Sequence, residues 1–120
     1  MTLQECYQAL GGDYNEVLGR LRSEKLVQKF VLKFLQDGSY DLLVTSMAEE
    51  NYGEAFRAAH TIKGICQNLS FTRLYESSSA LSEALRGGFT PEAPAIFEQV
   101  KADYQHVAGV ISEFQGGAEV

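Results

Sequence analysis

Residues 55–69 read Ala55-Phe56-Arg57-Ala58-Ala59-His60-Thr61-Ile62-Lys63-Gly64-Ile65-Cys66-Gln67-Asn68-Leu69, and this stretch predicts an amphipathic helix. On a helical wheel of about 100° per residue, with His60 at zero, five apolar residues share an arc from about 180° to 260°: Ala55, Ala59, Ile62, Cys66 and Leu69. Four other residues fall together between about 300° and 40°: His60, Lys63, Gly64 and Gln67. The helix is therefore expected to bury the apolar arc and to turn the second group, here called the His60 stripe, away from the core.

Helix start and stop signals recur on both sides of this stretch. The expected starts before it are Thr2, Asp13 with Glu16 as its capping-box partner, Ser23, Ser39 and Asn51. The expected stops are Gly11-Gly12 and Asp37-Gly38. After the stretch, Ser70 or Thr72 opens a helix that stops at Arg86-Gly87-Gly88, and Thr90-Pro91-Glu92 opens the last helix.

Apolar residues recur every three or four positions in the last helix: Ile96, Val100, Tyr104, Val107, Ile111 and Phe114. No segment alternates polar and apolar residues convincingly, so the sequence predicts an all-α bundle with short loops. The 120 residues suffice for one domain with one core. We expect N-terminal helices over about residues 1–22, a bundle over about 23–115 and a tail over 116–120.

The composition restricts location and partners. The net charge is −6 and the basic residues look scattered, which argues against a nucleic-acid partner. No long apolar run predicts a membrane span, and the N-terminus lacks a secretory pattern, so we expect a cytoplasmic location with Cys6 and Cys66 reduced. Met1 and the short segment after Phe114 favour a stand-alone protein, and the lack of a leftover apolar stripe favours a monomer.

Three members of the His60 stripe fit one chemistry, the transfer of a phosphoryl group. A neutral imidazole is a competent nucleophile toward phosphorus near neutral pH. The ammonium group of Lys63, one turn along the helix, can balance charge on phosphoryl oxygens, and Gly64 leaves room for a partner to approach. Gln67 offers a neutral hydrogen-bond donor, although a solvated glutamine is the more common state.

The motif Ala59-His60-Thr61-Ile62-Lys63-Gly64 resembles the signature of histidine-containing phosphotransfer (HPt) domains, which is His-x-x-Lys-Gly on an alanine-rich helix. Asn68-Leu69 and Leu81-Ser82-Glu83-Ala84-Leu85-Arg86 resemble the family's continuation into a second helix. The resemblance implies an antiparallel four-helix bundle with short additional N-terminal helices. It also implies a phosphocarrier rather than an enzyme with a small substrate, in which His60 accepts a phosphoryl group from a receiver domain's phospho-aspartate and passes it to another receiver.

The same resemblance implies the roles of neighbouring residues and partners. Lys63 stabilises the phosphoryl charge and Gly64 gives the partner access, while Mg²⁺ is supplied by the receiver, so no cofactor or metal of the chain's own is expected. The partners are response-regulator receiver domains, a sensor histidine kinase, or both. Ser70 stands where many members have glycine, and we expect it to cap the next helix with little consequence. Ser82 stands where some members have glutamine, so Ser82 and Gln67 are both candidates to support the imidazole.

Other readings of the sequence have less support. A carboxylate-histidine metal site is disfavoured because Arg57 and Asp103, not glutamates, stand three residues before the two histidines. No glycine-rich phosphate loop or nucleophile elbow favours a kinase or a hydrolase. The main alternative is a non-catalytic docking module for receiver or kinase domains, with Phe56 in an apolar docking rim. The motif also occurs in the phosphorylated domain of chemotaxis-type kinases, where an ATP-binding domain is the donor, and this possibility stays open.

Overall fold

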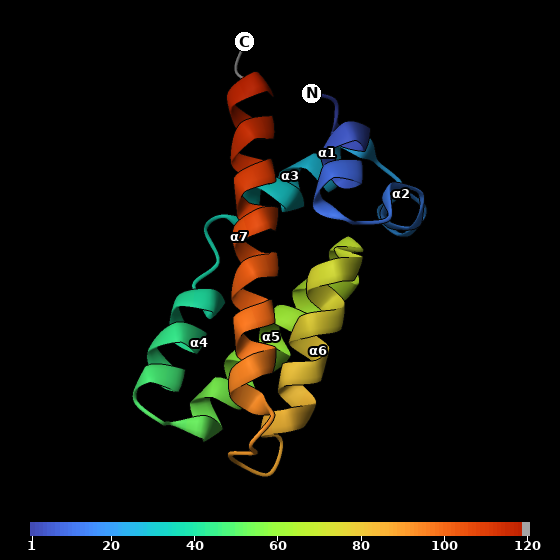
Figure 1. Ribbon diagram of the computed structural model, residues 1–120. Coiled ribbons are helices and arrows are strands. Elements are labelled where there is room, and N and C mark those ends of the chain that lie inside the picture. Colours follow the sequence, from blue (N-terminus) through green and yellow to red (C-terminus); the bar gives the residue numbers. More distant parts are fainter. Residues whose placement is uncertain (119–120) are drawn as a thin grey trace.

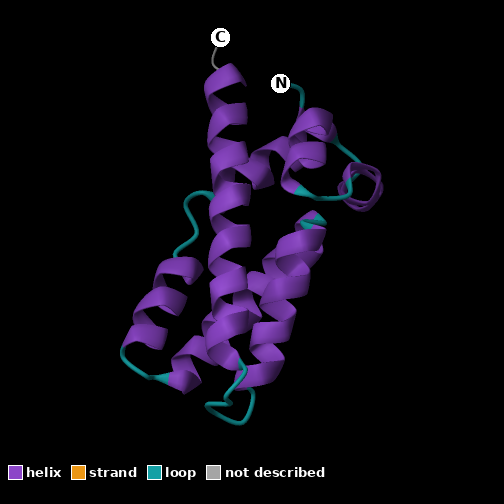
Figure 2. Ribbon diagram, in the orientation of Figure 1, coloured by secondary structure: helices purple, strands orange, loops and turns teal. Residues whose placement is uncertain are grey.

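The computed structural model describes residues 1–118, which form seven helices. In chain order they are α1 (Leu3–Leu10), α2 (Tyr14–Leu21), α3 (Glu24–Phe34), α4 (Ser39–Ala48), α5 (Tyr52–Leu69), α6 (Thr72–Leu85) and α7 (Ala93–Ala118). The described residues include no strand (Figure 2), so the predicted all-α class is confirmed. Over the same range, no helix has the length and apolar character needed to cross a membrane.

Helices α4 to α7 form an antiparallel four-helix bundle, and the three short helices gather at the end where α5 finishes and α6 begins (Figure 1). α4 packs against α5, α5 against α6 and α6 against α7. α7 continues beyond the other bundle helices and packs against α1 (Figure 1). α3 packs against α2, α5 and α7 at this end.

Side-chain caps begin four helices where the sequence predicts them. Thr2 and Glu5 form a reciprocal capping box at the start of α1. Asp13, Ser23 and Asn51 each accept a hydrogen bond from the backbone N–H three residues later, at the starts of α2, α3 and α5. Each cap satisfies one of the backbone donors that a helix N-terminus leaves without a partner.

The junction between α5 and α6 differs from the sequence prediction. Ser70 does not cap α6. Instead it ends α5 in the left-handed conformation, with φ of 57°, and α6 follows Phe71 without a side-chain cap. A left-handed C-cap is a position that glycine adopts at lower cost, so the expectation that Ser70 caps the next helix is wrong.

The two ends of α7 also differ from the prediction. The Thr90 hydroxyl donates to the Ala84 carbonyl at the end of α6, so it ties the loop to α6 instead of capping the last helix. α7 begins at Ala93 and continues to Ala118, so residues 116–118 of the predicted tail are helical. Glycine lowers helix stability by only about 1 kcal/mol per residue and does not by itself stop a helix. Residues 119–120 of the predicted tail lie outside the described residues.

The N-terminal helices and the loop between them donate hydrogen bonds to carbonyl groups at the C-terminal end of α5. The Tyr7 hydroxyl donates to the Leu69 carbonyl at 2.8 Å, and Arg20 Nη1 donates to the Asn68 carbonyl at 2.6 Å. The backbone N–H of Asp13 donates to the Ser70 carbonyl at 2.9 Å. These bonds satisfy acceptors that the end of a helix leaves open, and they anchor the helix that carries His60.

Candidate functional site

Helix α5 presents the His60 stripe as the sequence predicts. The five residues of the apolar arc are at most 3% exposed. On the other side of the helix, His60, Gly64 and Gln67 are exposed and Lys63 is half-buried. The division follows from periodicity alone, because residues three and four apart share a face of a helix.

The imidazole of His60 is held by packing and not by hydrogen bonds. Its ring stacks on the half-buried ring of Phe56, with centroids 5.9 Å apart and planes inclined by 24°. Within residues 1–118 it has no hydrogen-bond or salt-bridge partner. Both ring nitrogens are therefore free to react with or bind an incoming group.

Basic side chains near the His60 imidazole come from two parts of the chain, helix α5 and the end of α6. Arg86, which follows α6, has its guanidinium carbon 5.6 Å from the centroid of the Phe56 ring. Its Nη2 donates to Glu83 at 2.7 Å, and this hydrogen bond lowers the pKa of the Glu83 carboxyl. The charges of Arg86 and Lys63 lower that pKa further, so Lys63 lies within electrostatic reach of α6. An anion bound beside His60 would meet cations from both α5 and α6.

Gly64 makes this surface open. A Cβ atom built on Gly64 would have no non-local heavy atom within 4 Å. Gly64 is exposed and lies one helical turn after His60. The arrangement allows another protein to come close to the imidazole.

Neither candidate support residue contacts the imidazole through a hydrogen bond. Gln67 lines a pocket of about 370 Å³ together with Arg20, Ser70 and residues of α6, away from the ring. Ser82 is 1% exposed, and its hydroxyl has no hydrogen-bond partner in the described part of the chain. Phe56 stacks on the imidazole, and Lys63 and Gly64 share the His60 stripe of α5, whereas Gln67 and Ser82 form no hydrogen bond with the imidazole.

Sequence reasoning gave no role to Arg86 or Glu83. Both lie at the end of α6, beside the N-terminal half of α5 in the antiparallel pair (Figure 1). The signal available was the short turn between the two helices, because residues equally distant from such a turn lie side by side. The other histidine, His106, lies on α7, and its Nε2 is 2.6 Å from the Ala9 carbonyl. Among residues 1–118, no group of three potential ligands is arranged to hold a metal ion.

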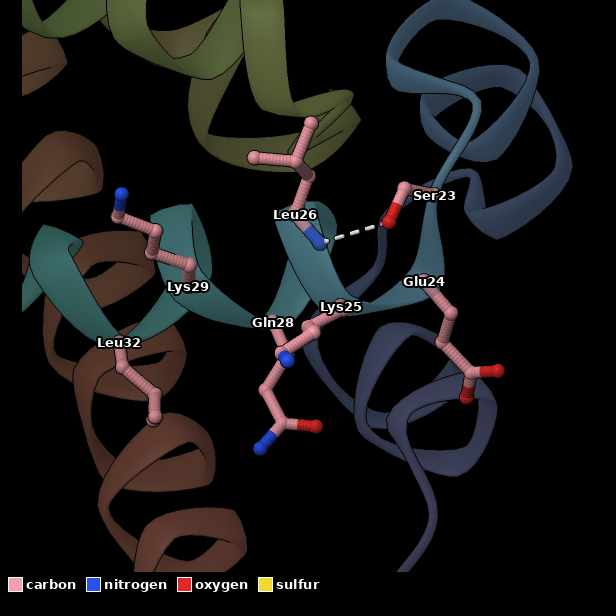
Figure 3. A pocket seen from close by; sticks show the side chains of 7 residues that line it. All are labelled: Ser23, Glu24, Lys25, Leu26, Gln28, Lys29 and Leu32. Carbon is pink, nitrogen blue, oxygen red and sulfur yellow. Dashed lines mark hydrogen bonds between the residues drawn. The ribbon is translucent and has the colours of Figure 1, made fainter.

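A larger hollow, of about 740 Å³, lies elsewhere, on the outer surface of α3 between Ser23 and Leu32 (Figure 3). All of its lining residues belong to α3 or to the residue that caps it. It contains no residue of the His60 stripe, so it is not part of the site on α5.

A protein-family model described as "Hpt domain" matches residues 2–109 of the chain. The match extends from the cap of α1 into α7 and includes every residue of the site on α5 and α6. Searches of curated proteins and of solved structures gave no significant match.

Proposed function

This chain belongs to the Hpt domain family, and from that premise we propose that it is a histidine phosphocarrier of a two-component phosphorelay. Phosphotransfer in two-component signalling is the role that goes with the family. In the proposal, His60 accepts a phosphoryl group from the phospho-aspartate of one receiver domain and passes it to a second receiver. The observation that carries it is the exposed imidazole, which has no hydrogen-bond partner among residues 1–118 and lies on α5 beside Lys63 and the open surface of Gly64.

The proposed reaction is an in-line exchange at phosphorus. A ring nitrogen of neutral His60 forms the N–P bond as the acyl-oxygen–phosphorus bond of the phospho-aspartate breaks. The aspartate leaves as a carboxylate, and the proton on the other ring nitrogen is retained or lost to solvent according to pH. The second transfer reverses these steps with another aspartate as nucleophile, so no group is consumed.

The neighbouring residues act on charge and access. Lys63 stabilises the negative oxygens of the phosphohistidine, and Arg86 adds a second positive charge from the α6 side. Gly64 lets the receiver's loops approach the ring. The Mg²⁺ ion required for phosphoryl transfer comes with the receiver's acidic site, so the chain contributes no metal ligand.

The test is phosphoryl transfer from a panel of phosphorylated receiver domains to three proteins: wild type, His60→Gln and His106→Gln. The proposal predicts an acid-labile, base-stable label on wild type and on His106→Gln, and none on His60→Gln. His106→Gln is the matched control because the chain has only two histidines and His106 lies on α7. A label that survives in His60→Gln would refute the assignment.

The same assay separates the alternatives. Measurable receiver binding without any label would favour the non-catalytic docking module. A label obtained from an ATP-binding kinase domain but from no receiver would place the chain with the phosphorylated domains of chemotaxis-type kinases.

A further inference from the structure

The basic side chains fall into two groups according to their ion pairs. Within residues 1–118, five of them form salt bridges: Arg20, Arg57, Arg73, Arg86 and Lys101. The other five have no acidic partner within salt-bridge distance: Arg22, Lys25, Lys29, Lys33 and Lys63. In a protein of net charge −6, the unpaired cations therefore lie on or next to α3, with one more in the His60 stripe.

This distribution corrects the view that the basic residues are scattered. Residues 20–33 contain half of the ten lysines and arginines of the chain and only one acidic residue, Glu24. The clustering is visible in the sequence once charges are counted in windows. That four of these five basic residues have no acidic partner within salt-bridge distance in the described chain becomes visible only in the folded structure.

Three of these lysines share one exposed face of α3. Lys25, Lys29 and Lys33 are spaced by four residues and all are exposed; we call them the α3 lysine face. In Figure 3, Lys29 extends upward on the side of Leu26, which is 40% exposed, whereas Lys25 extends downward in the view. The opposite side of α3 is buried through Val27, Val31 and Phe34. Like charges four residues apart on a helix repel, and within residues 1–118 none of these three lysines forms a salt bridge that would offset this repulsion.

The α3 lysine face is continuous with the His60 site. Lys33 and Phe30 on α3 line a hollow of about 220 Å³ together with Ile65 and Asn68 on α5. Ile65 directly follows Gly64, and Asn68 lies one turn beyond it. At about 1.5 Å per residue, Asn68 is only about 12 Å along the helix axis from His60. A partner that covers Gly64 and Asn68 would therefore also meet Lys33.

We propose that the α3 lysine face is an electrostatic docking surface for the receiver domain, which attracts the acidic surface around the receiver's phospho-aspartate as the two proteins approach. This inference rests on the proposed phosphocarrier function. The match is one of charge, because a site that binds Mg²⁺ and carries an aspartyl phosphate is rich in carboxylates. Complementary charge at such a surface mainly accelerates encounter and orients the partner, and salt weakens it.

The test uses the full chain with Lys25, Lys29 and Lys33 each changed to glutamine. The matched control changes Thr45, Ala95 and Ala102 to glutamate, which alters the net charge by the same three units. These three positions are exposed and lie on α4 and α7. His60 is first phosphorylated with phosphoramidate, a small donor that needs no docking surface. Transfer to the receiver domain that wild type phosphorylates fastest is then timed over a range of salt concentrations.

The lysine variant is expected to be labelled by phosphoramidate like wild type. Its second-order transfer rate at low salt should fall about tenfold, and the difference should fade as the Debye length shrinks to about 3 Å near 1 M salt. The glutamate control should stay within about twofold of wild type, since its added charges lie on α4 and α7 and not on the α3 lysine face. Circular dichroism of all variants checks that the exposed substitutions leave the helices intact.

Three outcomes would count against the inference. Equal transfer rates and equal salt dependence for the lysine variant and wild type would overturn it while leaving the phosphocarrier function in place. An equal loss in the glutamate control would show an effect of net charge and not of the α3 face. If only wild type bound vesicles of phosphatidylglycerol and phosphatidylcholine, with transfer unchanged in the variant, the face would belong to a lipid surface. Failure of every phosphorylated receiver domain to transfer a phosphoryl group to wild type would instead refute the proposed function itself.

Discussion

His60 combines exposure with a fixed ring position. Stacking on Phe56 limits the orientations of the imidazole, and no hydrogen bond to a described residue occupies either nitrogen. A nucleophile in this state needs no internal bond to be broken before it attacks phosphorus. Stabilisation of the transferred phosphoryl group must therefore come from the residues around His60. These residues balance the charge of the incoming group and control its access to the imidazole.

Lys63→Ala should leave the phosphoryl acceptor in place and weaken its stabilisation. We expect the phosphohistidine to hydrolyse faster, or the transfer to slow, by about tenfold, which corresponds to about 1.4 kcal/mol. The measurement is the decay of a ³²P label on His60 after removal of the donor. Lys101→Ala is the control, because Lys101 pairs with Glu98 on α7. Unchanged lifetime and transfer rate would remove Lys63 from the site.

Gly64→Gln should block the receiver while sparing the imidazole. The added side chain would occupy the open surface beside His60, so transfer from a receiver should fall by at least about tenfold. Labelling by phosphoramidate should continue, because a small donor needs less room. Gly109→Gln is a matched control, since Gly109 is also an exposed helical glycine with no non-local heavy atom within 4 Å of a built Cβ. Undiminished receiver binding by Gly64→Gln would contradict the proposed role.

At the residue scale, helical periodicity in the sequence was sufficient to predict which side chains of α5 are buried and which are exposed. The burial of Ile62 and the exposure of His60 follow from their angular positions on one helix. Arg86 was missed because its place beside Phe56 depends on the register between α5 and α6. Ser82 was named because it stands where some members of the family have glutamine, and this correspondence did not reveal that its hydroxyl is buried.

At the scale of elements, α5 depends on α1 and α2 for its C-terminal end. The left-handed conformation of Ser70 costs free energy, and two side-chain hydrogen bonds that glycine cannot form offset this cost. Its hydroxyl donates to Glu16 at 2.6 Å and accepts from Arg20 at 3.0 Å. The local caps were predictable because each involves residues three apart in the sequence. This network was not, because Glu16 and Ser70 are separated by 54 residues.

The Glu16 carboxylate makes this junction sensitive to acid. The hydrogen bond from Ser70, followed by that from Arg20, holds the pKa of Glu16 below its ordinary value. A carboxyl group whose pKa is lower in the folded state stabilises the fold above its unfolded pKa, and this stabilisation is lost as pH falls through the folded pKa. Wild type should therefore melt at a higher temperature than Glu16→Gln at pH 7, and the difference should shrink as pH falls below the ordinary glutamate pKa of about 4.3.

Thermal unfolding followed by circular dichroism across this pH range checks the prediction. Glu113→Gln provides a control, since Glu113 is exposed on α7 and has no salt-bridge partner in the described range. A difference between wild type and Glu16→Gln that persists unchanged at low pH would show that the Glu16 charge does not stabilise the junction.

At the scale of the whole molecule, the N-terminal helices and the bundle meet at a tight seam. A Cβ atom on Gly12 would lie 2.7 Å from the Ser70 carbonyl oxygen and 2.8 Å from the Tyr7 ring. The loop between α1 and α2 can approach the end of α5 this closely only because residue 12 has no side chain. The sequence marked Gly12 as part of a helix stop, but its role in the seam required the relative placement of segments nearly 60 residues apart.

Gly12→Ala should destabilise the fold by about 1–3 kcal/mol, the usual cost of forcing extra atoms into a packed contact. Gly19→Ala is the matched control, because no non-local heavy atom lies within 4 Å of its built Cβ and alanine favours a helix. Its stability should be unchanged or higher by up to about 1 kcal/mol. Urea unfolding of the two variants gives both values. Equal stabilities would mean that the seam is not closely packed.

The central claim is that His60 carries the phosphoryl group, and the most direct measurement is the site of the label. Wild-type protein is incubated with a phosphorylated receiver domain, and the modified residue is located by tandem mass spectrometry under neutral conditions that preserve N–P bonds. The account predicts phosphate on His60 alone. Phosphate on His106, or on a hydroxyl or carboxyl side chain with His60 unmodified, would contradict it.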